Sequence, residues 1–181
     1  MTYVRGTVLV SSLQSLASHM LLTRYYQALP SELHGEVRSL VAGAWVPAQI
    51  ALAHYRACDA LCLAPTQEVE IGRTAGARID RTLFASLLKL AKQAGVTPWA
   101  ALGMFGKIQA RVLVGGAVTV HAFGPKDAVI ELYKIPVFDL RYMRNAYCGA
   151  VQGLCDRFCR KSYMKVTEVT AGRAVFELSW A

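Results

Sequence analysis

The chain has 181 residues, of which 54% are hydrophobic and 18% are charged, and its 20 Lys and Arg residues against 12 Asp and Glu residues give a formal net charge of +8. This length fits one domain over residues 1–181, and the apolar composition excludes an intrinsically disordered chain and a coiled coil. The longest segments without a charged residue, 7–23 and 39–55, are diluted by Ser, Gly, Pro and His residues, so we expect no membrane span.

The beginning of the chain and its cysteines predict the compartment. The opening sequence MTYVRGTVLV has no basic start, no long apolar stretch and no cleavage site of the kind that signal peptides carry. Five cysteines, an odd number, favour free thiols over a disulfide framework. We therefore expect a cytoplasmic protein.

The first third of the chain predicts one strand followed by helices. Residues 3–10 are rich in β-branched and aromatic residues, which is typical of a strand. Apolar residues at three- and four-residue spacing then predict a helix over 12–28 and a second helix over 31–43. A third helix over 47–65 begins at a proline and is apolar over most of its surface, so we expect it in the interior.

The longest predicted helix covers residues 66–95, with acidic residues in its first turn and lysines near its end, as the helix dipole favours. Gly72 and Gly76 lie one turn apart in it, so one face is flat enough for another helix backbone to approach closely. A shorter helix follows over 97–110, beginning at a Thr-Pro pair.

The periodicity then changes to two. Strands are predicted over 111–123 and 128–137 around a Gly-Pro-Lys-Asp turn, a helix over 140–161, and a closing hairpin from 163–169 and 173–180. The order predicts an α+β domain in which an N-terminal strand and a helical layer pack on a small antiparallel sheet, completed by a C-terminal hairpin, helix and hairpin.

The cysteines suggest one possible metal site. Cys58 and Cys62 lie four residues apart on one predicted helix, and Cys155 and Cys159 lie four apart on another. Four thiolates would hold zinc if the two helix faces met. The alternatives are ordinary packing of buried thiols and a redox role. We favour packing and expect no zinc.

No catalytic signature is present. The sequence lacks GxSxG, HExxH, a phosphate-binding glycine loop and a paired set of carboxylates, so we expect no enzyme. His54 is the most interesting histidine, because a lone imidazole on a mostly apolar helix could ligate haem or contact a ligand. The alternative for His54 is a hydrogen-bonded core residue.

Basic residues bracket the predicted helix over 140–161. Together with two neighbouring tyrosines they form the best candidate for anion contacts: Arg141, Arg144, Arg157 and Arg160. They lie at both ends of the helix instead of along one stripe, so a solvated face is the alternative, and we do not expect nucleic acid as the main partner.

Several segments, taken in order, resemble a family of uncharacterised domains of about 180 residues that is expanded in myxobacteria. The resemblance covers residues 3–180 and rests on YVRGTVLVSSLQSL, YYQALPSEL, AWVPAQIALAHYRACDAL, EIGRTAGARIDRTLF, TPWAALGMFGKIQARVLVGGAVTV and VTEVTAGRAVFELSW. That family is similar to the superfamily of haem-NO-binding domains, 4-vinyl-reductase-type sensory domains and trafficking-complex subunits. The resemblance implies an α+β sensory or partner-binding domain, often dimeric, with an apolar cavity between helices and sheet.

The functional residues of those relatives do not carry over. Haem-binding members hold the haem propionates with a Tyr-x-Ser-x-Arg motif, which this sequence lacks, and some sensory members have cysteines in the terminal hairpin, which here has none. The resemblance therefore implies the pocket without haem or zinc.

Three functions remain open at this stage. The first is a non-enzymatic regulatory or sensory domain that binds a small apolar ligand or a protein partner, in a pocket for which the candidates are Trp45, His54, Tyr55, Trp99, Phe105 and Tyr147. The second is a self-associating homodimeric scaffold without a ligand, and the third is a weak nucleic-acid binder. Each pocket candidate has ordinary core packing as its alternative.

Overall fold

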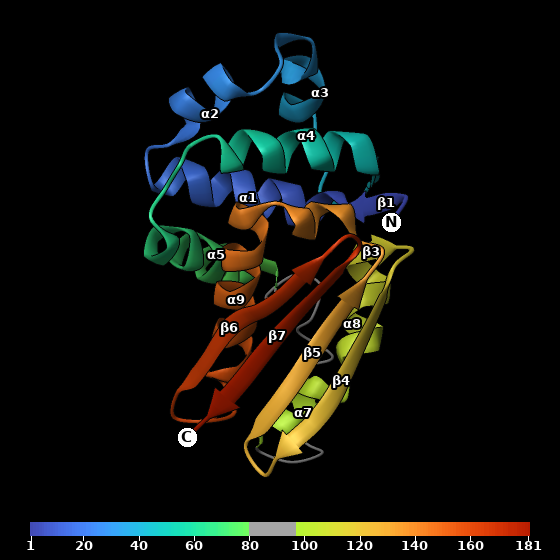
Figure 1. Ribbon diagram of the computed structural model, residues 1–181. Helices are drawn as coiled ribbons and strands as arrows, with labels where there is room; N and C mark the ends of the chain where they lie inside the picture. The colour runs from blue at the N-terminus through green and yellow to red at the C-terminus, as the bar shows by residue number, and fades with distance from the viewer. Residues whose placement is uncertain (80–96) are drawn as a thin grey trace.

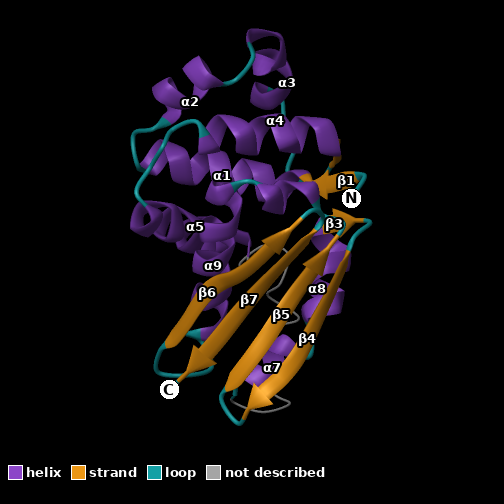
Figure 2. Cartoon of the chain, viewed as in Figure 1, coloured by secondary structure: helices purple, strands orange, loops and turns teal. Residues whose placement is uncertain are grey.

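A computed structural model describes residues 1–79 and 97–181, and it confirms the α+β class. A helical layer of α1 (Gly6–Ser18), α2 (Leu22–Ala28), α3 (His34–Arg38) and α4 (Ala48–Asp59) lies at one end of the molecule. A four-stranded antiparallel sheet extends from it, with α9 (Arg141–Cys155) joining the two parts (Figures 1 and 2). No helix in the described residues is both long and apolar enough to cross a membrane.

The N-terminal strand is shorter than predicted, and this part of the prediction is wrong. Strand β1 covers only Tyr3–Arg5, and α1 begins at Gly6 within the segment expected to be extended. Leu9, Ser12 and Leu16 recur at helical spacing and are all buried, so packing of one helix face overrides the β-propensity of the intervening valines. A side chain at Gly6 would collide with the carbonyl group of Val41.

The predicted helix over 12–28 is also interrupted. α1 ends at Ser18, Met20 adopts a positive φ of 58°, and α2 starts at Leu22. The second predicted helix is a short 3-10 turn over Ser31–Leu33 followed by α3. The third predicted helix is confirmed as α4.

A small second sheet was not predicted. β2 (Trp45–Pro47) and β3 (Leu113–Val114) both pair with β1 in antiparallel orientation. Strands of two or three residues carry too little periodicity to be recognised in a sequence, and only the pairing of distant segments reveals them.

The predicted helix over 66–95 is present as α5 (Pro65–Ile79), and the remainder of that prediction lies outside the described residues. The following helix is divided into α7 (Pro98–Leu102) and α8 (Phe105–Val112). α8 includes the first residues of the segment predicted as a strand over 111–123.

The four-stranded sheet has the order β4-β5-β7-β6, with both predicted hairpins confirmed. Its strands are β4 (Ala117–Gly124), β5 (Asp127–Tyr133), β6 (Ser162–Thr170) and β7 (Arg173–Trp180). Ile130, Phe176 and Leu178 are fully buried on the face that α9 covers, and a 3-10 turn over Pro136–Asp139 leads from β5 into α9.

α5 and α9 cross at backbone contact, as the glycine pair predicts. A Cβ atom at Gly72 would lie 2.5 Å from Cα of Ala146, and one at Gly76 would lie 2.9 Å from Cα of Ala150. α9 presents Gly149 to the Val69 carbonyl in the same way. The crossing fixes the distance between the two helices that form one wall of the site described next.

Candidate functional site

A cavity of about 180 Å³ lies between α5, α8, α9 and the sheet, and α1 closes one end. The main wall is one face of α9, from Tyr142 to Leu154, opposite Phe105 and Ile108 of α8. Among the described residues that line it, none is charged and none is His or Cys. The polar lining side chains are Ser12, Tyr55, Gln109, Tyr142 and Tyr147.

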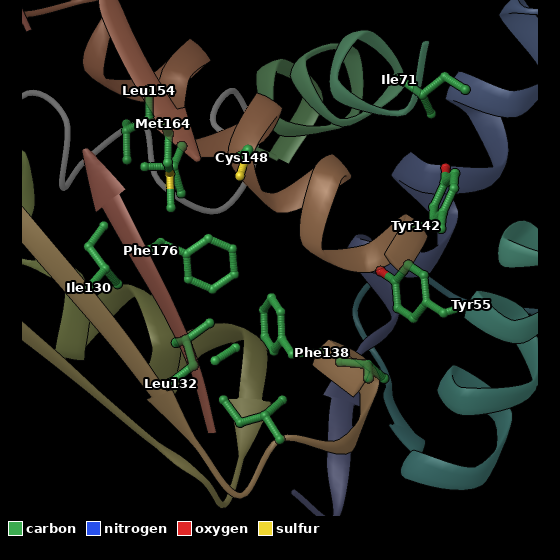
Figure 3. Close-up of a cluster of buried hydrophobic side chains, with 14 of the residues drawn as sticks. Tyr55, Ile71, Ile130, Leu132, Phe138, Tyr142, Cys148, Leu154, Met164 and Phe176 are labelled. Atoms are coloured by element: carbon green, nitrogen blue, oxygen red, sulfur yellow. The ribbon is translucent and has the colours of Figure 1, made fainter. Parts of the chain in front are cut away.

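Three of the predicted pocket residues line this cavity. Tyr55 comes from α4, Phe105 from the start of α8, and Tyr147 from the middle of α9. The Tyr147 ring packs against both Phe138 and Phe176, with centroid distances of 5.0 and 5.2 Å. Figure 3 shows Phe138 and Phe176 within the same apolar cluster.

The other three lie outside the cavity lining, each for a visible reason. Trp45 is on β2 and 38% exposed, with the Arg5 guanidinium 4.1 Å from its ring centroid. Trp99 donates a hydrogen bond from Nε1 to the Pro125 carbonyl (3.0 Å) and so packs against the β4–β5 turn. His54 points into the helical layer, where it has its own partners.

His54 is a hydrogen-bonded core residue, as the alternative interpretation expected. Its Nδ1 shares a hydrogen bond with the Tyr25 hydroxyl (2.8 Å), and its Nε2 shares one with the Ser12 hydroxyl (2.9 Å). All three side chains are buried. Burial lowers the pKa of His54 to about 3, so the imidazole is neutral near pH 7. This chain of side chains ends at Ser12, which is also part of the cavity wall.

Tyr142 is the residue that the sequence interpretation missed as part of the pocket. Its side chain is 1% exposed and the residue lines the cavity, while its hydroxyl oxygen is buried beside Ser12 and Cys58. Burial raises the pKa of this phenol, and the neighbouring Cys58 raises it further. The Tyr55 and Tyr142 rings lie next to each other, 6.5 Å between centroids, and the Tyr142 hydroxyl lies on the side of α1 (Figure 3).

Two acidic residues, Asp59 and Glu68, hold the beginning of α9, and therefore Tyr142, in place. The Asp59 carboxylate at the end of α4 accepts a hydrogen bond from the Tyr142 backbone N–H (2.7 Å) and caps the helix. Glu68, whose side chain is fully buried, pairs with Arg141 (2.8 Å) and accepts a hydrogen bond from Asn145 (2.6 Å). Burial raises the pKa of Glu68, and Asn145 and Arg141 oppose this shift.

The predicted anion contacts divide into two separate groups. Arg141 pairs with Glu68, and Arg144 donates hydrogen bonds to the Phe138 and Asp139 carbonyls. These two arginines therefore hold the helix start. Arg157 and Arg160 are exposed near the other end of α9, beyond its last residue. The four do not form one basic surface.

The four cysteines of the zinc hypothesis do not come together. Cys58 lies beside Tyr142 at the beginning of α9, whereas Cys155 is thirteen residues further along that helix. At about 1.5 Å per residue the separation is about 20 Å. Within residues 1–79 and 97–181, no group of three or more His, Cys, Asp or Glu side chains could hold a metal ion.

The sequence matches no protein-family model and no curated protein. The structure, in contrast, is similar to solved H-NOX (haem-NO/oxygen-binding) proteins over the whole chain. The Fe(II) unliganded H-NOX protein from K. algicida matches 100% of this chain and 97% of its own, with a TM-score of 0.69 and 9% identity. A mutant of the T. Tengcongensis H-NOX matches 97% of each chain, with a TM-score of 0.65 and 10% identity.

The chain has an H-NOX-like fold. At this level of identity the similarity concerns the fold alone, and it agrees with the superfamily that the sequence segments resemble. The narrower resemblance to the myxobacterial family stays a prediction.

The residues at this cavity do not fit haem. Haem iron is held by His, by Cys thiolate, by Met beside His, or by Tyr phenolate. The described lining has no His or Cys, and residues 80–96 contain no His, Cys, Met or Tyr. Burial raises the pKa of Tyr55, Tyr142 and Tyr147, which disfavours the phenolate. The described lining also has no cation for the propionates.

Proposed function

We propose that the chain is a non-enzymatic sensory domain that binds a small apolar molecule in the cavity beside α9. The observation that carries this proposal is a cavity with an apolar, uncharged described lining at the junction of the helical layer and the sheet. Sites for small molecules are concave and mostly apolar, with a few polar groups that orient the ligand. Here the polar residues of the lining are Ser12, Tyr55, Gln109, Tyr142 and Tyr147.

The size of the cavity indicates the size of the ligand. An engineered apolar cavity of about 150 Å³ holds benzene, and this one measures about 180 Å³. A ligand of about the size of benzene, or slightly larger, would fit. The H-NOX-like fold supports the proposal as an analogy of architecture, because structures with this fold include haem proteins.

The other functions have less support from the contacts of their residues. For nucleic acid, Arg141 and Arg144 are occupied by Glu68 and by backbone carbonyls. For a homodimer, the large exposed hydrophobic residues are distributed over several elements, among them Met20, Phe123 and Tyr163. Self-association stays a prediction that light scattering on the purified protein would test.

A cavity-filling substitution tests the proposed function. Ala75 of α5 lines the cavity, whereas Ala77 of the same helix does not. Small aromatic molecules screened by thermal shift should raise the melting temperature of the wild type and of Ala77→Leu, because a ligand that binds only the folded state stabilises it. Ala75→Leu should lose this response. An equal response in both variants, or none in the wild type, would refute binding in this cavity.

A further inference from the structure

We infer that the outer face of the small β2-β1-β3 sheet binds a short acidic segment of a partner protein. The sheet lies where the helical layer meets the four-stranded sheet (Figure 1). None of the side chains on its outer face lines the cavity, so this docking site is separate from the proposed ligand site.

The two faces of the small sheet differ in burial. The strand register places Val4 and Val46 on the inner face, where both are buried. The outer face consists of alternate residues of the three strands: Tyr3, Arg5, Trp45, Pro47 and Val114. Tyr3, Trp45 and Val114 are 45%, 38% and 40% exposed. Three large hydrophobic side chains are therefore exposed next to one another, and such a patch is typical of a protein-binding surface.

The charge on this face is positive. The segments 2–5, 43–48 and 111–115, which contain the three strands, include two arginines and no Asp or Glu residue. The Arg5 side chain donates hydrogen bonds to the carbonyls of Gly43 (2.8 Å) and Arg111 (3.4 Å), and its guanidinium lies over the Trp45 ring. These contacts hold the guanidinium in place, and no carboxylate of the described residues forms an ion pair with it. A carboxylate of a partner would supply the missing counter-charge.

The size and charge of the face favour a short segment over a second copy of this chain. A standard protein interface takes about 20–30 residues from each partner, whereas this face offers the five side chains named above. In a symmetric dimer the same patch meets itself, so the two Arg5 charges would repel each other. Trp, Tyr and Arg contribute most to binding energy at interfaces. We therefore expect apolar side chains of the partner over Tyr3 and Trp45, and a carboxylate at Arg5.

Selection from a random phage-displayed peptide library tests the chemistry of the partner. The library would first be depleted on the double variant Tyr3→Ser and Trp45→Ala, which removes peptides that bind elsewhere, and then selected on the wild type. Enriched peptides should combine Asp or Glu with apolar residues. Enrichment of neutral or basic peptides, or no enrichment, would overturn the inference. So would wild-type binding to phosphatidylserine vesicles without peptide enrichment, or a dimer in light scattering that Trp45→Ala dissociates.

Fluorescence polarisation of the most enriched peptide tests the residues. Arg5→Gln and Trp45→Ala should each weaken binding by about tenfold or more. Val114→Glu leaves the contacts of Arg5 in place and adds a carboxylate to the face, so it should weaken binding to a similar extent. Phe123→Ala is the control, because Phe123 is 84% exposed near the end of β4 that is remote from β3. Circular dichroism verifies that each variant is folded. Unchanged affinity in folded Trp45→Ala and Val114→Glu would overturn the inference, as would an equal loss in Phe123→Ala.

Discussion

The crossing of α5 and α9 makes a prediction that is opposite in sign to the intrinsic helix preference. Alanine stabilises a helix relative to glycine by about 1 kcal/mol when the site is open. Gly72→Ala should nevertheless destabilise the protein, because its new methyl group would lie 2.5 Å from Cα of Ala146 and closer still to the Ala146 carbonyl oxygen.

The magnitude follows from the shift that the methyl group requires. Carbon atoms in contact sit about 3.5 Å or more apart, so the helices would have to separate by about 1 Å. Both sides of the contact are backbone, so no rotamer change relieves it, and overpacking of this kind costs about 3 kcal/mol or more. After subtraction of the helix preference, the free energy of unfolding should fall by about 2 kcal/mol or more.

Urea denaturation followed by circular dichroism measures this change, and Gly106→Ala is the matched control. Gly106 lies in α8, and a Cβ atom there would have no neighbour within 4 Å. Gly106→Ala should therefore stabilise the protein by up to about 1 kcal/mol. A Gly72→Ala protein as stable as the wild type would show that the two helices do not approach as closely as the structure has them.

Two further predictions concern ionisable groups. Burial lowers the pKa of His54 from 6.5 to about 3, so between these pH values the unfolded chain binds a proton that the folded chain does not. From pH 7 to pH 5 the free energy of unfolding should therefore drop by about 2 kcal/mol more in the wild type than in His54→Gln. Equal drops in urea denaturation would contradict this. The free energy of unfolding of Asp156→Ala should be about 2 kcal/mol lower than that of the wild type at pH 7, because hydrogen bonds from Ser162 and Arg73 outweigh the burial of Asp156 and lower its pKa. This difference should shrink below about pH 4 as the carboxylate of the wild type is protonated. Equal stability of the two proteins at pH 7 would refute the prediction.

The sequence predicts the elements with strong periodicity and misses those that depend on distant partners. α9 and the two hairpins have clear helical or alternating patterns, and Gly72 and Gly76 indicate a close helix approach that the structure confirms. The segment after Gly6 reads as a strand because its valines and threonine favour extended backbone. It is a helix because its small and apolar residues form one buried face, which only the three-dimensional packing on other helices reveals.

The sequence predicts part of the candidate site and misses the rest for the same reason. Tyr55, Phe105 and Tyr147 lie at the cavity because each is on the face of α4, α8 or α9 that turns toward it, and their role in binding stays a prediction. Aromatic character alone does not separate them from Trp45 and Trp99, which are large but face other surroundings. Tyr142 lies on the same broad face of the predicted helix over 140–161 as Tyr147, whereas the burial of its hydroxyl beside Ser12 and Cys58 is a property of the folded surroundings.

The cavity itself has an energetic consequence that bears on function. Apolar walls that no side chain covers lose the dispersion contacts of a filled core, so the unfilled space of this cavity lowers the stability of the folded chain. A single larger residue at Ala75 would recover some of it, yet the position is alanine. A molecule that fills this space would stabilise the walls contributed by α5, α8, α9 and the sheet together, and this coupling of occupancy to the packing of separate elements is what a ligand sensor requires.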